Sequence, residues 1–131
     1  MVGLDTNVLV CYIMQDDPAQ SARASAVIES LSLDQPGFIS LVAVVELVWV
    51  LGGSYKLQRV QIAAALDTLL RSKELVLDRA EVVAQALRGY RAGSADFADE
   101  LIARIATAAG CSHTLSFDAK AVKSAGMVMV A

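Results

Sequence analysis

The amino-acid sequence predicts an α/β fold with a mainly parallel central sheet flanked by helices. Short apolar stretches that suit strands alternate with longer stretches whose apolar residues repeat at helical spacing. Strands that are separated by helices pair in parallel through right-handed crossovers. The chain has 131 residues, of which 56% are hydrophobic, and this is enough for one buried core. We therefore expect a single domain over residues 1–131.

The expected elements follow one another with recognisable boundaries. Asp17 before Pro18 is typical of a helix start, because proline suits the first helical position. Gly52-Gly53 and Gly110 are typical of helix ends. We expect strands over residues 1–4, 38–40, 74–77, 112–117 and 127–130. We expect helices over residues 18–32, 41–51, 58–71, 79–91 and 94–109, with a helical or loop segment over 8–14 and a short helix over 119–124.

The composition excludes several classes of protein. The longest apolar run, Leu41–Leu51, is interrupted by Glu46 and falls short of the roughly 20 residues that a membrane span needs. The N-terminus lacks a basic leader and carries Asp5 where a signal peptide is apolar, so we expect no secretion. Cys11 and Cys111 lie far apart without CxxC spacing, as expected for reduced thiols in a cytoplasmic protein.

The formal net charge of −3 argues against a broad basic surface for duplex DNA. It does not exclude nucleic acid, because acids that bind a divalent cation reverse the local field and let the site accept a phosphate. Candidate phosphate contacts are Lys56, Arg59, Arg79, Arg88 and Arg91. For each of them a solvated surface role is the alternative.

Three acids occupy positions where a folded core gives no structural reason for a carboxylate. Asp5 and Asp118 each follow an expected strand, and the functional sites of parallel sheets lie beyond the carboxyl ends of the strands. Glu46 lies one to two turns into the helix after the second strand, so we expect it at the same edge. That helix is apolar almost all round, which predicts a buried acid in need of a partner.

Three further acids lie close together in the helix that ends at Gly110. Asp99 shares a stripe with Ile102 and Ala106, which predicts that it faces the core. Asp96 is either an accessory acid of the same site or an acid favoured at a helix N-terminus. Glu100 is expected to form a solvated surface pair with the arginine four residues later.

Several acids near one edge of a sheet predict a metal site. Clustered carboxylates repel one another unless a divalent cation neutralises them, and oxygen ligands alone suit Mg²⁺ or Mn²⁺ rather than zinc. Structural alternatives stay open: a cap of the following segment at Asp5, an ion pair at Glu46, a helix-start acid at Asp99 and an N-cap at Asp118.

The order of the acidic segments also carries a family resemblance. The segments are Leu4-Asp5-Thr6-Asn7-Val8-Leu9, Glu46 in an apolar helix, Ala95-Asp96-Phe97-Ala98-Asp99-Glu100-Leu101-Ile102-Ala103, and Leu115-Ser116-Phe117-Asp118. This pattern resembles the PIN-domain ribonucleases, and most closely the VapC-type toxins of bacterial toxin–antitoxin pairs. The resemblance covers nearly the whole chain. Its specific parts are Asp-Thr-Asn near the N-terminus and Asp-Phe-Ala-Asp later, whereas Phe-Asp alone is short.

The resemblance implies a single PIN-like domain and a Mg²⁺- or Mn²⁺-dependent endoribonuclease with an RNA substrate and a cognate antitoxin that silences it. It implies that the catalytic and metal-binding acids are Asp5, Glu46, Asp99 and Asp118, with Asp96, Thr6, Asn7 and Ser116 as accessory groups. Ser116 is a departure, since the family more usually has threonine there, but the hydroxyl is retained.

The remaining expectations concern histidine, apolar surface and partners. A bound metal would activate water without a histidine base, so we expect the single histidine, His113, to pack inside a strand. The helices around residues 41–70, with Trp49 and Tyr55, carry more apolar surface than a small monomer hides. This suggests a homodimer face or a groove for an antitoxin, with a well-filled core as the alternative.

Other functions fit the acids less well. A receiver domain needs paired acids directly after the first strand and a lysine after the fifth, whereas Asp16-Asp17 precede Pro18 and Asp78 has no suitable lysine partner. A haloacid-dehalogenase-type phosphatase needs a second aspartate where Asn7 stands. A PIN-like binding module without nuclease activity stays open, although the acids appear complete.

Overall fold

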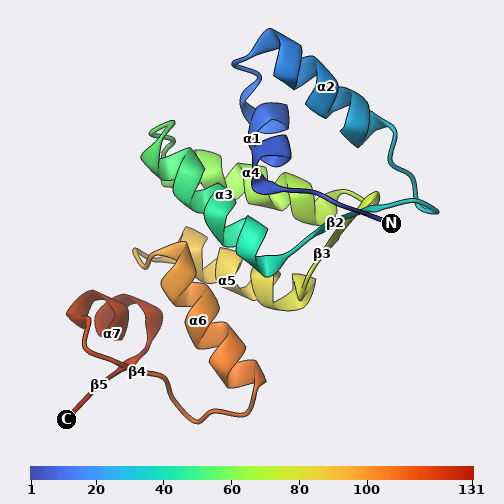
Figure 1. The fold of residues 1–131 in the computed structure, drawn as a ribbon. Coiled ribbons are helices and arrows are strands. Elements are labelled where there is room, and N and C mark those ends of the chain that lie inside the picture. The colour runs from blue at the N-terminus through green and yellow to red at the C-terminus, as the bar shows by residue number, and fades with distance from the viewer. The chain divides into compact units, whose positions relative to one another are not determined.

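A computed structural model describes residues 1–131, which form two compact units, residues 1–78 and residues 79–131 (Figure 1). The first unit contains β1 (Val2–Gly3), α1 (Thr6–Met14), α2 (Pro18–Glu29), β2 (Gly37–Ile39), α3 (Leu41–Gly53), α4 (Arg59–Arg71) and β3 (Leu75–Leu77). The second unit contains α5 (Ala80–Ala92), α6 (Phe97–Ala108), β4 (Leu115–Ser116), α7 (Ala119–Ala125) and β5 (Val128–Met129).

The first unit is built on a three-stranded parallel sheet in the order β1-β2-β3. Gly37 of the central strand pairs with Val2 on one side and with Leu75 on the other. A side chain at Gly37 would meet the terminal methyl groups of Leu31 and Leu4, so these leucines pack closely over the central strand. The helices α1 and α2, and then α3 and α4, form the connections that parallel strands need. The fully buried side chains of the first unit include Leu9, Ile39, Val44, Leu47, Leu51 and Leu66.

The second unit is a helical pair with a small parallel sheet. The rings of Tyr90 in α5 and Phe97 in α6 meet edge to face, with centroids 5.8 Å apart and planes at 86°. β4 and β5 pair in parallel through Leu115 and Val128, and α7 connects them. The alternation of short strands and helices therefore continues to the end of the chain.

The predicted α/β class, with parallel strands and flanking helices, is confirmed by both units. The prediction of a single domain over residues 1–131 stays a prediction. None of the seven helices combines the length and the apolar character that crossing a bilayer requires.

Several element boundaries differ from the expected ones. The segment over residues 8–14, expected as either helix or loop, belongs to helix α1. Helix α2 ends at Glu29 rather than at residue 32. Gly52 and Gly53 belong to α3 instead of ending it, because the N–H of the following serine still donates to a carbonyl of the helix. β4 covers only Leu115–Ser116, much less than the strand expected over residues 112–117.

Two side-chain predictions in the second unit are wrong. His113 is exposed and lies before β4, so it does not pack inside a strand; its ring nitrogen Nδ1 shares a hydrogen bond with the Ser112 hydroxyl at 2.9 Å. Glu100 does pair with Arg104, at 3.6 Å, but only 5% of Glu100 is exposed. Its carboxylate lies against Gly89 of α5, where no side chain stands in its way.

Candidate metal centre

Asp5 is held at the junction of β1 and α1. The N–H of Leu4 still donates to the Phe38 carbonyl at 2.9 Å, so the chain stays extended up to the acid. Asp5 is then the N-cap of α1, and its Oδ1 accepts the backbone N–H of Thr6 at 2.7 Å. The capping alternative is therefore correct. Since a carboxylate has two oxygens, capping through Oδ1 leaves Oδ2 for another ligand.

Thr6 joins this junction to the third helix. Its side chain is buried, and its hydroxyl Oγ1 donates to Oε1 of Glu46 in α3 at 2.9 Å. The bond links the first turn of α1 to an acid 40 residues later. It fixes one oxygen of Glu46 and leaves the other to accept a cation or a proton. Thr6, expected only as a polar neighbour of Asp5, is thus the group that orients Glu46.

Glu46 itself corrects a prediction. The apolar sequence of α3 predicts a mostly buried helix, yet Glu46 is exposed, on a face that also carries the exposed side chains of Val42 and Trp49. The buried face of α3 consists of Ala43, Val44, Leu47 and Leu51. Glu46 therefore needs no buried Arg or Lys partner, and its charge carries little desolvation cost in the absence of metal.

A second group of acids lies in the second unit. Asp96 is the N-cap residue of α6 and Asp99 lies in the first turn of that helix. Asp118 is the N-cap of α7, where its Oδ1 accepts the N–H of Lys120 at 2.9 Å. Its own N–H donates to the Ser116 hydroxyl at 2.9 Å. The N-cap alternative for Asp118 is correct, and the hydroxyl at position 116 helps to hold it there.

Electrostatics show that these acids act on one another. Burial raises the pKa of Asp99 above its ordinary value, and the carboxylates of Asp96 and Asp118 raise it further, while Lys120 lowers it. The Lys120 ammonium lies 3.2 Å from Oδ1 of Asp96. One lysine thus partly offsets three carboxylates, and the excess of negative charge is the condition that a divalent cation relieves.

The stripe that was expected to carry Asp99 into the core is not the buried face of α6. Ile102 is 53% exposed, and Ala106 and Asp99 are half-buried. The buried residues of the helix are Phe97, Glu100 and Leu101. Because Phe97 and Leu101 face inward, Asp99 lies at the border of the buried face, where a carboxylate can still reach a solvent-borne ion.

The donor chemistry fits a hard divalent ion. The candidate ligands are carboxylates throughout: Asp5 and Glu46 in residues 1–78, and Asp96, Asp99 and Asp118 in residues 79–131. Oxygen donors of this kind suit Mg²⁺ and Mn²⁺. No group of three or more His, Cys, Asp or Glu side chains is already gathered as a metal site within the structure.

Two functional candidates were missed by sequence reasoning. Lys120 follows an N-cap residue by two positions, and that spacing brings its ammonium back toward the acids at the start of α6. Arg23 of α2 lines a pocket with Asn7, the third residue of the Asp-Thr-Asn segment. Gln20, three residues earlier on the same face of α2, also lines the pocket, but this is visible only in the structure.

The family model described as PIN domain matches residues 2–126 of the chain. The protein therefore belongs to the PIN domain family. Proteins with this fold are generally metal-dependent nucleases that use Mg²⁺ or Mn²⁺. A comparison with curated proteins gives no match.

Proposed function

We propose that this protein is a divalent-metal-dependent endoribonuclease and the toxin component of a toxin–antitoxin pair. The observation that carries the proposal is the set of acids inside the PIN match: Asp5 and the Thr6-oriented Glu46 in one unit, and Asp99 between Asp96 and Asp118 in the other. These residues lie in the order that the resemblance to VapC-type toxins requires.

The proposed ligands are Asp5, Glu46, Asp99 and Asp118, with Mg²⁺ or Mn²⁺ as the ion. When bound, the ion supplies Lewis-acid chemistry: it lowers the pKa of water and offsets the charge that develops at phosphorus. Thr6 holds Glu46 in one orientation, and Ser116 holds Asp118. Asp96 is an accessory acid whose charge Lys120 balances.

The toxin role implies a protein partner, and exposed apolar side chains in the first unit support one. Trp49, Val42 and Val60 of α3 and α4 are 83%, 70% and 73% exposed. Apolar side chains that gather at a surface are typical of protein interaction sites. We propose that the cognate antitoxin or a second copy of the chain covers them. Co-expression with the product of a small neighbouring gene, followed by sizing of the complex, tests this role.

The deciding experiment compares RNA cleavage by the wild type and by Asp5→Asn, each freed of antitoxin, in EDTA and in Mg²⁺ or Mn²⁺. Asparagine keeps the cap of α1 and changes only the charge. We expect cleavage by the wild type with metal, none in EDTA, and a loss in the variant that exceeds the roughly 10–100-fold effect of an outer-shell change.

Equal cleavage by the two proteins would reject the assigned site. If neither protein cleaves while both remain folded, the nuclease proposal fails and the PIN-like binding module without activity takes its place.

A further inference from the structure

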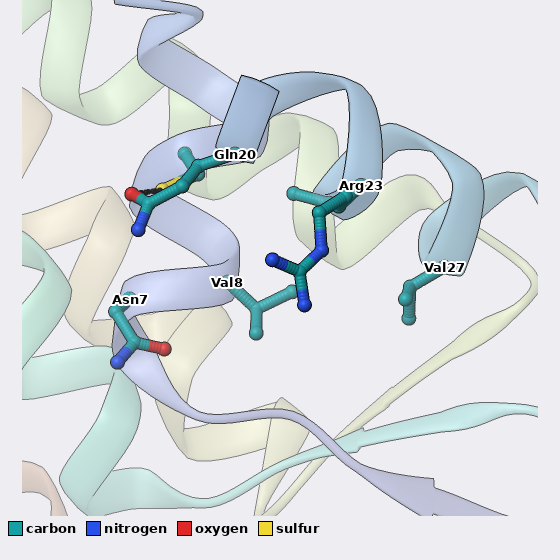
Figure 2. A pocket seen from close by; sticks show the side chains of 7 residues that line it. Asn7, Val8, Gln20, Arg23 and Val27 are labelled. Carbon is teal, nitrogen blue, oxygen red and sulfur yellow. Dashed lines mark hydrogen bonds between the residues drawn. The ribbon is translucent and has the colours of Figure 1, made fainter. Parts of the chain in front are cut away.

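The first unit contains a pocket between α1 and α2 with a volume of about 340 Å³ (Figure 2). We propose that this pocket binds one nucleoside of a single-stranded RNA, next to the bond that the enzyme cleaves, and that Arg23 anchors it. The proposal rests on the proposed nuclease function and names the part of the substrate that this surface recognises.

The polar side of the pocket has unused donors. Arg23 extends from α2 toward Val8 of α1 (Figure 2), and its guanidinium has no hydrogen bond or ion pair with another protein group. A guanidinium offers five N–H donors in a planar fork that suits a phosphate or the edge of a base. An exposed arginine that lines a concave surface without a partner is therefore available to an anionic or base-bearing ligand.

Two amides add hydrogen-bonding capacity. The Asn7 side chain is exposed and lines the pocket from the first turn of α1. From α2, Gln20 lines the same pocket, and its Oε1 accepts a hydrogen bond from Sγ of Cys11 at 3.6 Å, drawn as the dashed line in Figure 2. That bond orients the Gln20 amide and leaves its NH₂ group free to donate. Amides are suited to reading base edges, because each offers both a donor and an acceptor.

The floor of the pocket is apolar. Val8 is half-buried, Ala24 is buried and Val27 is 40% exposed at the rim. Apolar side chains and a guanidinium plane are the surfaces on which an unstacked base packs. The volume lies at the small end of the roughly 300–1,000 Å³ range of ligand pockets. It therefore suits one nucleoside better than a helix of a protein partner.

The location connects the pocket to the candidate metal centre. Val8 and Cys11 line it and stand three and six positions after Asp5 in the chain. At 1.5 Å per residue, this places them about 5–9 Å along α1 from the acid. That span is comparable with one nucleotide of a single strand. A phosphate at Asp5 and a neighbouring base in the pocket can therefore belong to the same RNA.

The test measures binding separately from cleavage. A fluorescent single-stranded RNA of about ten nucleotides is titrated by anisotropy into the full chain carrying Asp5→Asn, in EDTA and in Mg²⁺, with and without Arg23→Ala. We expect Arg23→Ala to weaken binding about tenfold, and Arg23→Lys to recover only part of the loss. In the otherwise wild-type enzyme, Arg23→Ala should raise KM and leave kcat nearly unchanged.

Arg71→Ala is the matched control. Arg71 is an exposed arginine of the same unit, at the end of α4, and it pairs with Asp67 at 2.8 Å. We expect its loss to change RNA binding by less than about twofold, since it is paired with Asp67 and is not among the residues that line the pocket between α1 and α2. Val27→Trp supplies a second test, because it fills the rim without removing a charge, and it should weaken RNA binding as well.

The outcomes separate the two proposals. The first outcome is that the wild type cleaves RNA, while Arg23→Ala has the same RNA affinity and the same KM as Arg71→Ala. In that case the pocket assignment is overturned and the nuclease proposal stands. If no protein cleaves RNA while Arg23→Ala still binds more weakly than Arg71→Ala, the pocket assignment stands and the catalytic proposal fails.

Discussion

Thr6 is proposed to act through Glu46, and its single side-chain hydrogen bond makes a sharp prediction. Thr6→Val keeps the shape of the buried side chain but removes the donor to Glu46. We expect metal-dependent cleavage to fall about 10–100-fold, as for other outer-shell partners of metal ligands. Thr6→Ser, which keeps the hydroxyl, should retain most of the activity. Initial rates over a range of Mg²⁺ concentrations measure both variants, and equal rates for Val and Ser would contradict the orienting role.

The sequence pointed to a set of candidate acids, but not to how each one is held. Asp5 and Asp118 are recognisable because each follows a strand and precedes a helix, and that same context makes each an N-cap. No local pattern predicts the Thr6–Glu46 bond, because it joins two helices 40 residues apart. Lys120 was missed for the same reason, since its partner Asp96 lies 24 residues earlier.

At the scale of elements, α5 and α6 depend on one small residue. A methyl group at Gly89 would collide with the Glu100 carboxylate, which is buried between the two helices and pairs with Arg104. We expect Gly89→Ala to lower the free energy of unfolding by about 1–3 kcal/mol, the usual cost of overpacking. Urea unfolding followed by circular dichroism measures the change.

Gly52→Ala is the control for the same chemical change in a helix. Its nearest neighbour would be a methyl group of Ile62 at 3.5 Å, an ordinary contact. Alanine there should leave stability unchanged or raise it by up to about 1 kcal/mol, because alanine favours the helix. Equal effects of the two substitutions would show that Glu100 does not constrain Gly89.

Helices were easier to predict than strands, for a physical reason. A helix can be predicted from repeated apolar spacing and a capping residue. Helix α4, for example, was expected over residues 58–71 and spans Arg59–Arg71. The strands have only two or three residues each, too few to show a period. Glu100 was misplaced because its pairing with Arg104 is local, whereas its burial depends on the glycine of a different helix.

At the scale of the whole molecule, we expect the acids to make stability depend on pH and, if they form the proposed site, on metal. In the metal-free protein, Asp99→Asn should stabilise the fold by at most about 1 kcal/mol at pH 7, because it removes a partly buried charge near two others. The raised pKa of Asp99 means that its ionised carboxylate destabilises the folded state. This destabilisation is absent at pH values below the ordinary pKa of 3.8 and is fully present above the raised pKa.

With Mg²⁺ present, the wild type should become more stable than Asp99→Asn, the reverse of the metal-free order. At ten times its Kd, the ion stabilises the wild type by about 1.4 kcal/mol, and Asp99→Asn should lose that gain. Thermal melts at pH 7 and near pH 4, with EDTA or Mg²⁺, measure both effects. Asp67 is a half-buried acid paired with Arg71 on α4, and Asp67→Asn should respond to Mg²⁺ as the wild type does. A Mg²⁺ shift that survives in Asp99→Asn would remove Asp99 from the ligand set.

The N-cap bonds of Asp5 and Asp118 have a genetic consequence. Asparagine caps a helix about as well as aspartate, and a single base change converts an aspartate codon into an asparagine codon. A cell under pressure to escape the proposed toxicity therefore has a one-step route that removes the chemistry and keeps the folded chain. Such escape alleles should gather at these two codons, and their products should still accumulate and still bind the proposed antitoxin.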